Sequence, residues 1–271
     1  MIHKAKKSMG QNFLKSKEAL FKMCEAGDVN NNDIVVEIGP GKGVLTEKLL
    51  EKAKNVIAIE KDRDLIDILK DKFANEIKEG KLILLNEDIL EFNPKTYNLE
   101  PETYKIIANI PYNITGSIIR RFLSEVNRPN TMTLLVQKEV AERIVARDNK
   151  ESILSLSIKA YGEPKYIMKV HKRFFSPSPK VDSAIISINN ISNKVFKDKK
   201  EEESFFRLIK AGFAHKRKVL RKNLEDLNIK EVGLPYIDEI FNKLEIDTKV
   251  RAEDVPFKKW LKIRESFDKN A

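Results

Sequence analysis

Cysteine and histidine are scarce in this 271-residue chain, and the scarcity excludes several kinds of site. The single cysteine, Cys24, excludes a disulfide framework and a cysteine-based zinc site. The three histidines, at positions 3, 171 and 215, are too far apart for a spaced ligand motif, so we predict no metal. No apolar run approaches the roughly 18 residues of a membrane span, and no apolar signal core follows the basic N-terminus. We therefore expect a soluble, cytoplasmic protein with no membrane partner.

Basic residues outnumber acidic ones, and they are unevenly placed. The chain has 51 Lys and Arg against 41 Asp and Glu, a net charge of +10. Three stretches contain no acid: residues 1–17 with five lysines, 164–181 with five basic residues and 204–224 with seven. The rest of the chain is mildly acidic. Lysine runs are common on solvated faces, but three separate acid-free stretches favour a polyanionic partner.

Apolar residues make up 41% of the chain, enough for a packed core, and their spacing alternates between two periods. Strands are predicted over 33–38, 55–60, 81–85, 104–109 and 131–136. Helices are predicted between them, over 44–53, 63–73, 115–126 and 139–147. This alternation predicts a parallel sheet with helices on both faces, an α/β Rossmann-like domain.

The pattern changes after residue 150. Segments 166–171 and 182–189 predict an antiparallel strand pair at the sheet edge, and residues 189–200 read as a linker. Everything beyond is predicted to be helical, over 201–213, 217–227, 236–244 and 256–267. We expect a domain of residues 1–190, which includes the basic segment 1–17, and a small all-helical domain of residues 191–271.

A glycine cluster, Glu37-Ile-Gly-Pro-Gly-Lys-Gly43, joins the first predicted strand to a helix. Glycines let a ligand approach the backbone, and the helix N-terminus offers free N–H groups. A phosphate-binding P-loop would need Ser or Thr after Lys42, and a dinucleotide fingerprint would need Gly in place of Val44. An acid followed by G-x-G-x-G is typical of S-adenosylmethionine enzymes, although tight turns also use glycine for purely structural reasons.

Two acids follow the next two strands. Glu60 ends the second strand 21 residues after Gly39, where a carboxylate would accept hydrogen bonds from both ribose hydroxyls. Asp88 follows the third strand, where it would accept one from the exocyclic amine of adenine. Both could be ordinary surface acids, but their strand-end positions favour a nucleoside-binding role.

The segment Asn109-Ile-Pro-Tyr112 ends the fourth strand, at the sheet edge where such folds bind ligands. A nucleobase amine is a poor nucleophile because its lone pair is delocalised into the ring. The Asn109 oxygen and a backbone carbonyl held by Pro111 can accept both N–H bonds, and Tyr112 can stack on the base. We interpret the segment as catalytic, acting by positioning and electrostatics, rather than as a turn without chemistry.

These motifs resemble the ribosomal RNA adenine N6-dimethyltransferase family almost from end to end. The matching segments, in order, are 6–14 (KKSMGQNFL), 37–46, 109–112, 136–140 (VQKEV), 175–181 (FSPSPKV) and 213–224 (FAHKRKVLRKNL). The run at 151–155 (ESILS) departs from the family's Gly-Arg-Leu-Ser pattern. The resemblance implies an S-adenosylmethionine-dependent rRNA adenine dimethyltransferase.

The resemblance also implies roles for individual residues. Asn12 and Leu14 would cover the cofactor, and Gly39 and Gly41 would line it. Glu60 and Asp88 would hold its ribose and adenine, and Asn109 would touch both cofactor and target base. Tyr112 and Phe175 would stack on the base, with Phe174 a core residue. RNA contacts are expected from five basic residues: Lys216, Arg217, Lys218, Arg221 and Lys222.

The segment at 213–224 resembles the small-subunit branch of the family. It implies dimethylation of two adjacent adenines in the 3′-terminal hairpin loop of small-subunit rRNA, with a role in small-subunit biogenesis. The expected partner is that rRNA, or the immature small subunit, bound by a monomer. Two alternatives stay open: a macrolide-resistance-type large-subunit rRNA methyltransferase, and a ribosome assembly or transcription factor that acts by binding alone.

Overall fold

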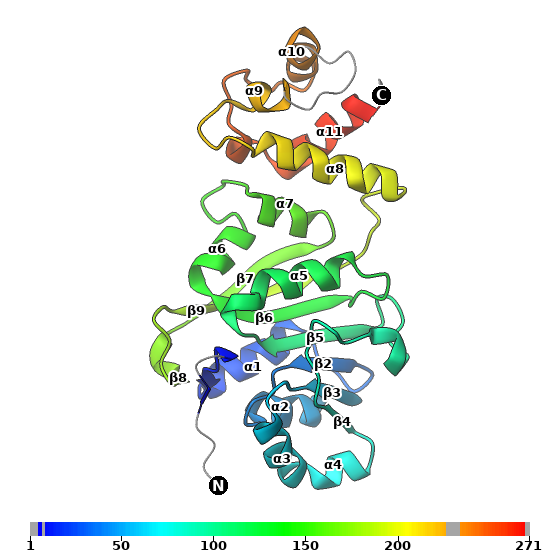
Figure 1. The fold of residues 1–271 in the computed structure, drawn as a ribbon, viewed down its shortest axis with the longest axis vertical. Coiled ribbons are helices and arrows are strands. Elements are labelled where there is room, and N and C mark those ends of the chain that lie inside the picture. The colour runs from blue at the N-terminus through cyan, green and yellow to red at the C-terminus, as the bar shows by residue number, and fades with distance from the viewer. Residues whose placement is uncertain (1–4, 7–8, 226–233, 269–271) are drawn as a thin grey trace. The chain divides into compact units, whose positions relative to one another are not determined.

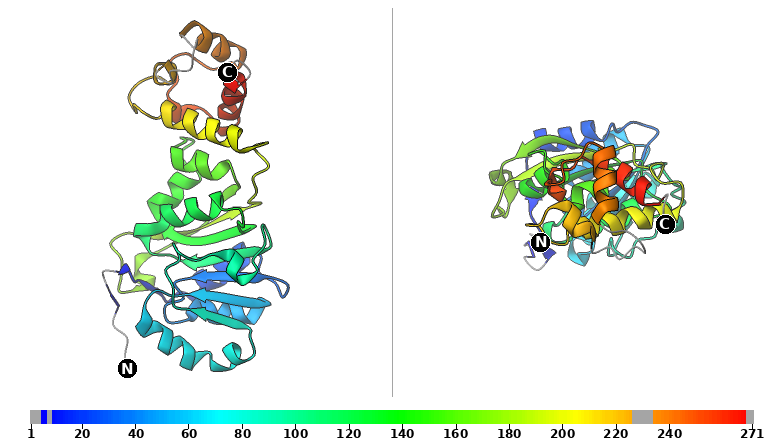
Figure 2. Two further views of the ribbon diagram at one scale, coloured as in Figure 1. Left: turned by 45° about the vertical axis from the view of Figure 1, so that its right-hand side comes forward. Right: turned by 90° about the horizontal axis from the view of Figure 1, so that it is seen from above.

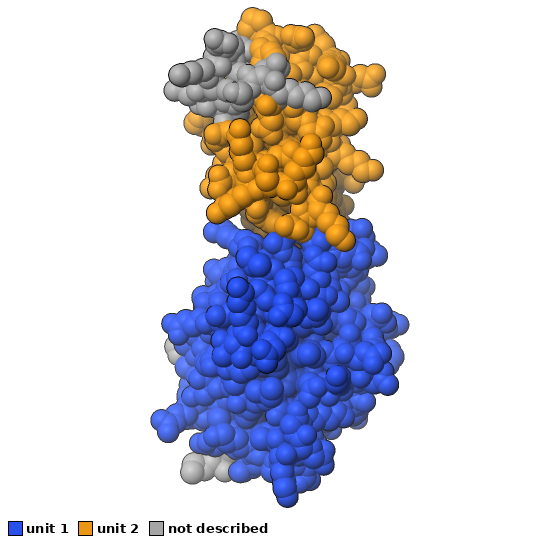
Figure 3. Space-filling view, turned by 90° about the vertical axis from the view of Figure 1, so that its right-hand side faces the viewer, with its two compact units in different colours: residues 1–141, 162–192 blue, residues 142–161, 193–271 orange. Residues whose placement is uncertain are grey.

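The computed structural model describes residues 5–6, 9–225 and 234–268. Parts of the basic segment 1–17 and of the helix predicted over 217–227 lie outside these ranges. The contacts divide the chain into two compact units, residues 1–141 with 162–192 and residues 142–161 with 193–271 (Figure 3). The division after residue 192 falls in the predicted linker, whereas residues 142–161 group with the second unit and not with the domain to which the sequence assigned them.

A seven-stranded sheet forms the centre of the first unit, in the order β4-β3-β2-β5-β6-β9-β7. The strands are β2 (Ile34–Ile38), β3 (Asn55–Ile59), β4 (Leu82–Leu85), β5 (Tyr104–Asn109), β6 (Thr131–Gln137), β7 (Glu163–Val170) and β9 (Ser183–Asn189). The first five in the order are parallel, and β9 pairs antiparallel with both β6 and β7. The predicted parallel sheet and its antiparallel edge pair are thus confirmed.

Helices lie on both faces of this sheet (Figures 1 and 2). The predicted ones are observed as α2 (Val44–Lys52), α3 (Arg63–Lys72), α5 (Thr115–Ser124) and α6 (Lys138–Ile144), and a short α4 (Ala74–Lys78) follows α3. The sequence prediction missed α1 (Lys17–Ala26), because its lysine-bearing start was read as part of a polar segment. The Ser16 side chain caps α1, whose buried face packs against α2, β6, β7 and β9.

The order of the strands fixes where a ligand can bind. From β2 the chain runs outward through β3 to β4, and then returns to the other side of β2 to form β5 and β6. The loops that follow β2 and β5 therefore diverge, and open α/β sheets bind ligands in the crevice at that switch point. The glycine turn follows β2 and the Asn109–Tyr112 segment follows β5.

A separate two-stranded sheet joins segments from opposite ends of the first unit. In it β1 (Phe13–Leu14) pairs antiparallel with β8 (Phe175–Ser176), so that Leu14 lies opposite Phe175. The Lys15 N–H extends the pairing by donating to the Phe174 carbonyl at 2.8 Å. The sequence prediction missed both strands, since two-residue strands carry no periodicity.

The described part of the second unit is helical, as predicted for 191–271. It contains α7 (Ile153–Lys159), α8 (Lys199–Gly212), α9 (Leu220–Glu225), α10 (Leu234–Lys243) and α11 (Phe257–Asp268). Short 3₁₀ turns in the described residues include η2 (Pro94–Tyr97), η3 (Tyr112–Ile114), η4 (Lys172–Phe174) and η5 (Ala252–Asp254). Large buried side chains, among them Trp260, Phe205 and Phe241, form the core of this unit. In the parts of the chain that the structure describes, no helix is long and apolar enough to cross a membrane.

The basic stretch in this unit is not one continuous helix, which corrects the prediction over 217–227. Helix α9 begins only at Leu220, and Lys216, Arg217 and Lys218 lie in the preceding turn. The buried Asn223 side chain donates to the Gly212 carbonyl at 2.6 Å and to the His215 carbonyl at 3.2 Å. These bonds satisfy carbonyls at the end of α8 and hold the turn in place of another helical turn.

The divergent run at 151–155 forms the start of α7. Ser152 and Ser155 make a reciprocal capping box. The buried Glu151 carboxylate accepts hydrogen bonds from the Ser155 hydroxyl at 2.7 Å and from Lys159 Nζ at 2.6 Å. This run therefore builds a local cap and a partly buried ion pair.

Candidate active site

A cavity of about 570 Å³ opens at the carboxyl ends of β2, β3 and β5, within the size range of small-molecule sites. Its walls come from five stretches of chain: 9–15, 37–45, 59–61, 87–90 and 109–114. Nine of the ten residues predicted for cofactor and base line it, namely Asn12, Leu14, Gly39, Gly41, Glu60, Asp88, Asn109, Pro111 and Tyr112. The tenth, Phe175, does not.

The glycine turn leaves one side of the cavity open. Gly39 has φ +64°, and a Cβ added to it would meet nothing within 4 Å. Gly41 is close to the N-terminal segment, since a Cβ there would lie 3.0 Å from the Phe13 ring. The turn thus presents bare backbone to a ligand beside Gly39 and is covered by Phe13 at Gly41.

Glu60 is buried at the end of β3, and backbone amides hold its carboxylate. Oε2 accepts from the Gly41 N–H at 3.1 Å, and Oε1 accepts from the Asp62 N–H at 2.9 Å. Burial raises the pKa of Glu60, and the two amide bonds oppose that shift. Each oxygen keeps a second lone pair, so this carboxylate is fixed in place and can accept from a pair of ribose hydroxyls.

Glu37, at the end of β2, is a cavity residue that the sequence prediction did not select. It is 1% exposed, and its Oε2 atom has no hydrogen-bond partner among the described residues. Burial raises the pKa of Glu37 to about 8. Its position directly before the glycine turn was the available signal, but the prediction used Glu37 only to classify the motif.

Asp88 follows β4 and is an ionised acceptor in the cavity wall. Its Oδ2 lies 2.7 Å from Lys61 Nζ, and its Oδ1 accepts from the Leu90 N–H at 3.0 Å. The hydrogen bond from Lys61 lowers the pKa of Asp88. An adenine amine that donates to Asp88 would therefore share this carboxylate with Lys61, a partner that the sequence did not reveal.

Asn109 and Tyr112 are each held by a residue distant in sequence. The Asn109 Nδ2 donates to the Asn12 carbonyl at 3.1 Å, which leaves Oδ1 to accept from a substrate amine. The Tyr112 hydroxyl lies 2.7 Å from Ser183 Oγ. Burial raises the pKa of Tyr112, so its ring is a neutral phenol at physiological pH.

The sequence predicts that Phe174 is a core residue and that Phe175 stacks on a base, and in the structure both contact the hydrophobic core. Phe175 is 3% exposed and packs in the core with Leu14 and Leu20, whereas Phe174 is only half-buried under the Arg173 guanidinium. The adjoining Ser176 lines the cavity. Stacking of Phe175 on a base stays a prediction, and it requires the ring to leave this core.

The five predicted RNA contacts differ in their surroundings. Lys216, Arg217 and Lys218 are exposed in the turn before α9. Arg221 instead makes a bidentate ion pair with Asp238, with both distances 2.8 Å, and Lys222 lies 3.7 Å from Glu225. The first three are therefore better placed than Arg221 to meet phosphates.

S-adenosylmethionine fits these residues on three observations. The open side of Gly39 accommodates a ligand against bare backbone, Glu60 is a preset acceptor for a diol, and the unpartnered oxygen of Glu37 can accept from an ammonium group. In residues 5–6, 9–225 and 234–268, no group of three or more His, Cys, Asp or Glu side chains could hold a metal ion.

Comparisons with known proteins agree with this site. The family model described as ribosomal RNA adenine dimethylase matches residues 2–269. Ribosomal RNA small subunit methyltransferase A of Fusobacterium nucleatum is 39% identical over 270 residues, 99% of each chain. A dimethyladenosine transferase from Plasmodium falciparum has a TM-score of 0.77 at 28% identity, over 95% of this chain and 98% of that one. The 23S rRNA methyltransferase ErmE shares the fold, with a TM-score of 0.80 at 24% identity over 95% of this chain and 100% of that one.

The family match spans nearly the whole sequence, and residues from four of the six matching segments, 6–14, 37–46, 109–112 and 175–181, line one cavity. This chain therefore belongs to the ribosomal RNA adenine dimethylase family and is an S-adenosylmethionine-dependent methyltransferase.

Proposed function

We propose that this enzyme dimethylates the N6 amines of two adjacent adenines in the 3′-terminal hairpin loop of small-subunit rRNA. It would do so in the cytoplasm, as a monomer bound to the immature small subunit during biogenesis. One observation carries the proposal: the residues suited to the cofactor and those suited to a base amine line the same cavity. Glu60 and Gly39 lie on the cofactor side, and Asn109 and Tyr112 lie at the end of the neighbouring strand β5.

The protein's part in the reaction is to hold and orient the amine. When bound, S-adenosylmethionine would supply an electrophilic methyl group, with S-adenosylhomocysteine as the leaving group and the displaced amine proton released to solvent. Asn109 Oδ1 accepts one N–H bond and the carbonyl before Pro111 accepts the other, which turns the nitrogen lone pair away from the ring. Tyr112 stacks on the base and aligns it with the methyl group. A loop adenine suits this site because it is easily unstacked.

Two observations favour the small-subunit substrate over large-subunit rRNA. The Fusobacterium relative, named for the small subunit, aligns over 99% of both chains. The basic turn before α9 lies in a segment that resembles the small-subunit branch. The likeness to ErmE concerns the fold alone and does not favour a large-subunit substrate. A factor that acts by binding alone would have no need for the buried Glu60 carboxylate and the oriented Asn109 amide.

The test is mass spectrometry of rRNA after incubation with S-adenosylmethionine. Wild-type enzyme should produce dimethyladenosine at two adjacent positions in immature small subunits and none in protein-free large-subunit RNA. Asn109→Ala should lower methyl transfer by about 100-fold or more, because it removes an acceptor used in the transition state, while RNA binding is largely kept. Dimethyladenosine found only in large-subunit RNA would refute the substrate, and unchanged transfer by Asn109→Ala would refute the catalytic role.

A further inference from the structure

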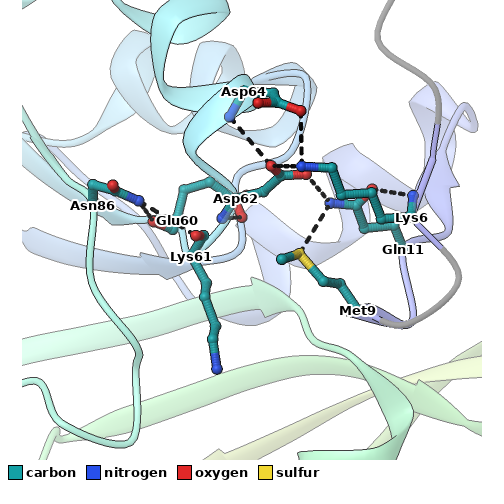
Figure 4. A network of polar contacts seen from close by, with 8 residues as sticks. All are labelled: Lys6, Met9, Gln11, Glu60, Lys61, Asp62, Asp64 and Asn86. Atoms are coloured by element: carbon teal, nitrogen blue, oxygen red, sulfur yellow. Dashed lines mark hydrogen bonds and ion pairs between the residues drawn. The ribbon is translucent and has the colours of Figure 1, made fainter.

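A buried aspartate outside the predicted site connects the N-terminal segment to the cofactor cavity. Asp62 follows β3, two residues after Glu60, and its side chain is 0% exposed (Figure 4). It caps α3, because its Oδ1 accepts from the Asp64 N–H at 3.2 Å. Capping uses only one of its oxygens, so the other contacts of Asp62 need a further explanation.

Two of those contacts go to the N-terminal segment, to Lys6 and Gln11. Lys6 Nζ lies 2.5 Å from Asp62 Oδ1 and 2.8 Å from Asp64 Oδ2, and Gln11 Nε2 donates to Asp62 Oδ2 at 2.7 Å. The Lys6 N–H in turn donates to Gln11 Oε1 at 2.7 Å, which closes a ring of hydrogen bonds (Figure 4). Charge-assisted bonds to a carboxylate held out of water are among the stronger polar contacts in proteins.

The residues that follow Gln11 form one wall of the cavity. The Asn12 carbonyl accepts from Asn109, the Phe13 ring lies against Gly41, and Leu14 pairs with Phe175. None of these contacts is a salt bridge, and β1 is only two residues long. Among the described residues, the contacts of Lys6 and Gln11 with Asp62 are therefore the ones that tie this wall to a buried charge.

The backbone N–H of Asp62 holds Glu60, another residue of the cavity wall. This N–H donates to Glu60 Oε1 at 2.9 Å, while Asn86 Nδ2 donates to the Glu60 carbonyl at 2.9 Å (Figure 4). One residue thus holds the carboxylate suited to the ribose and the segment that covers the cofactor.

We propose that Asp62 is a positioning residue that holds residues 9–14 over the bound cofactor like a latch, with Lys6 as its counter-ion. Opening of this wall would then limit the departure of the cofactor. The proposal holds whichever rRNA is methylated, because it concerns cofactor retention.

The test measures the dissociation rate of S-adenosylhomocysteine by surface plasmon resonance, together with hydrogen exchange of residues 9–14 in the protein without cofactor. Lys6→Met removes the cation, and Lys6→Arg restores it. Asp62→Asn removes the charge but keeps both a helix-capping oxygen and the N–H that holds Glu60. Lys17→Met is the matched control, since Lys17 is an exposed lysine of the same basic segment.

Lys6→Met and Asp62→Asn should each raise the dissociation rate by about three- to tenfold, the range for a charge-assisted bond that is partly exposed. Hydrogen exchange of 9–14 should accelerate with it. Lys6→Arg and Lys17→Met should behave as wild type. In the Asp62→Asn background, Lys6→Met should raise the dissociation rate little further, because both substitutions remove the same contact.

Three outcomes would overturn the latch. One is an unchanged dissociation rate in both Lys6→Met and Asp62→Asn. Another is an equal rise in Lys17→Met, which would show a general effect of charge. The third is a lower melting temperature in Asp62→Asn with exchange of 9–14 unchanged in both variants, which would leave Asp62 as a helix cap only.

Discussion

Two buried carboxyl groups, Glu37 and Glu60, line the same cavity but differ in their hydrogen bonding. Amides hold both oxygens of Glu60, whereas Oε2 of Glu37 has no partner in the described part of the chain. Burial is the largest cause of the raised pKa in each. Glu60 is thus a carboxyl group that amides hold in place, and Glu37 is one that burial keeps largely protonated at pH 7.

The raised pKa of Glu37 predicts how stability depends on pH. The pKa is about 8 in the folded protein and 4.5 as a model value, so between these limits the folded state binds more protons than the unfolded state. The free energy of unfolding should therefore fall as pH rises from 5 to 8, by at most about 1.4 kcal/mol per pH unit from this group.

Glu37→Gln should remove this contribution, because glutamine does not titrate. Denaturant titrations without cofactor at pH 5, 6.5 and 8 measure the free energy of unfolding. It should change less with pH in Glu37→Gln than in wild type. Glu91→Gln changes an exposed glutamate and should keep the wild-type slope. Parallel curves for wild type and Glu37→Gln would contradict the assignment.

At the scale of one element, the turn between β2 and α2 shows why the glycine pattern is used. Gly39 adopts φ +64°, and a Cβ added there would meet nothing within 4 Å. Gly80, shortly after α4, adopts φ +71° and has the same free space. The two glycines therefore have the same backbone requirement, and only Gly39 lines the cavity.

Gly39→Ala and Gly80→Ala should each lower the free energy of unfolding by about 1–2 kcal/mol, the cost of a left-handed backbone with a Cβ. Only Gly39→Ala should also weaken S-adenosylmethionine binding, by about tenfold or more, because the methyl group occupies ligand space. Calorimetric titration of both variants measures this difference. Equal cofactor affinity in the two would show that the ligand does not approach Gly39.

Prediction of single elements succeeded where the signal was local. Strand β5 was predicted over its observed range, since the apolar residues 106–108 lie at its middle. Prediction failed for α1, whose first residues are the charged Lys17 and Glu18. It also failed at the start of α9, where the non-local bonds of Asn223 hold a turn.

At the scale of the whole molecule, the basic stretches do not all perform the same task. Lys6 is committed to Asp62 within the cofactor unit, and Arg221 is committed to Asp238 within the helical unit. Lys216, Arg217 and Lys218 are exposed. We expect these three residues, and not Arg221, to make the electrostatic contribution to RNA affinity.

A triple variant in which Gln replaces Lys216, Arg217 and Lys218 should bind RNA more weakly. The slope of log affinity against log salt is negative, and its magnitude should decrease by about 2–3, roughly 0.7–0.9 per phosphate contact. Cofactor affinity should not change. Replacing Lys54, Lys70 and Lys78, which are exposed in the cofactor unit, removes the same charge and should change the slope less. Filter binding at several salt concentrations measures both variants. Equal slopes would contradict the assignment.

Arg221→Gln alone should act on stability instead. It breaks a bidentate pair with Asp238, so the melting temperature should fall while the salt slope of RNA binding stays near that of wild type.

The sequence alone determined the strand–helix alternation of the central sheet, the glycine turn and the polar residues at the strand ends, because each depends on neighbours along the chain. It was sufficient for the family, the cofactor and nine of the ten predicted cavity residues. Only the tertiary structure showed that β1 pairs with β8, that Phe175 is buried, that Lys61 shares Asp88, and that Lys6 and Gln11 meet Asp62. These contacts join residues up to 163 positions apart, the separation of the paired Phe13 and Ser176, and no local periodicity records them.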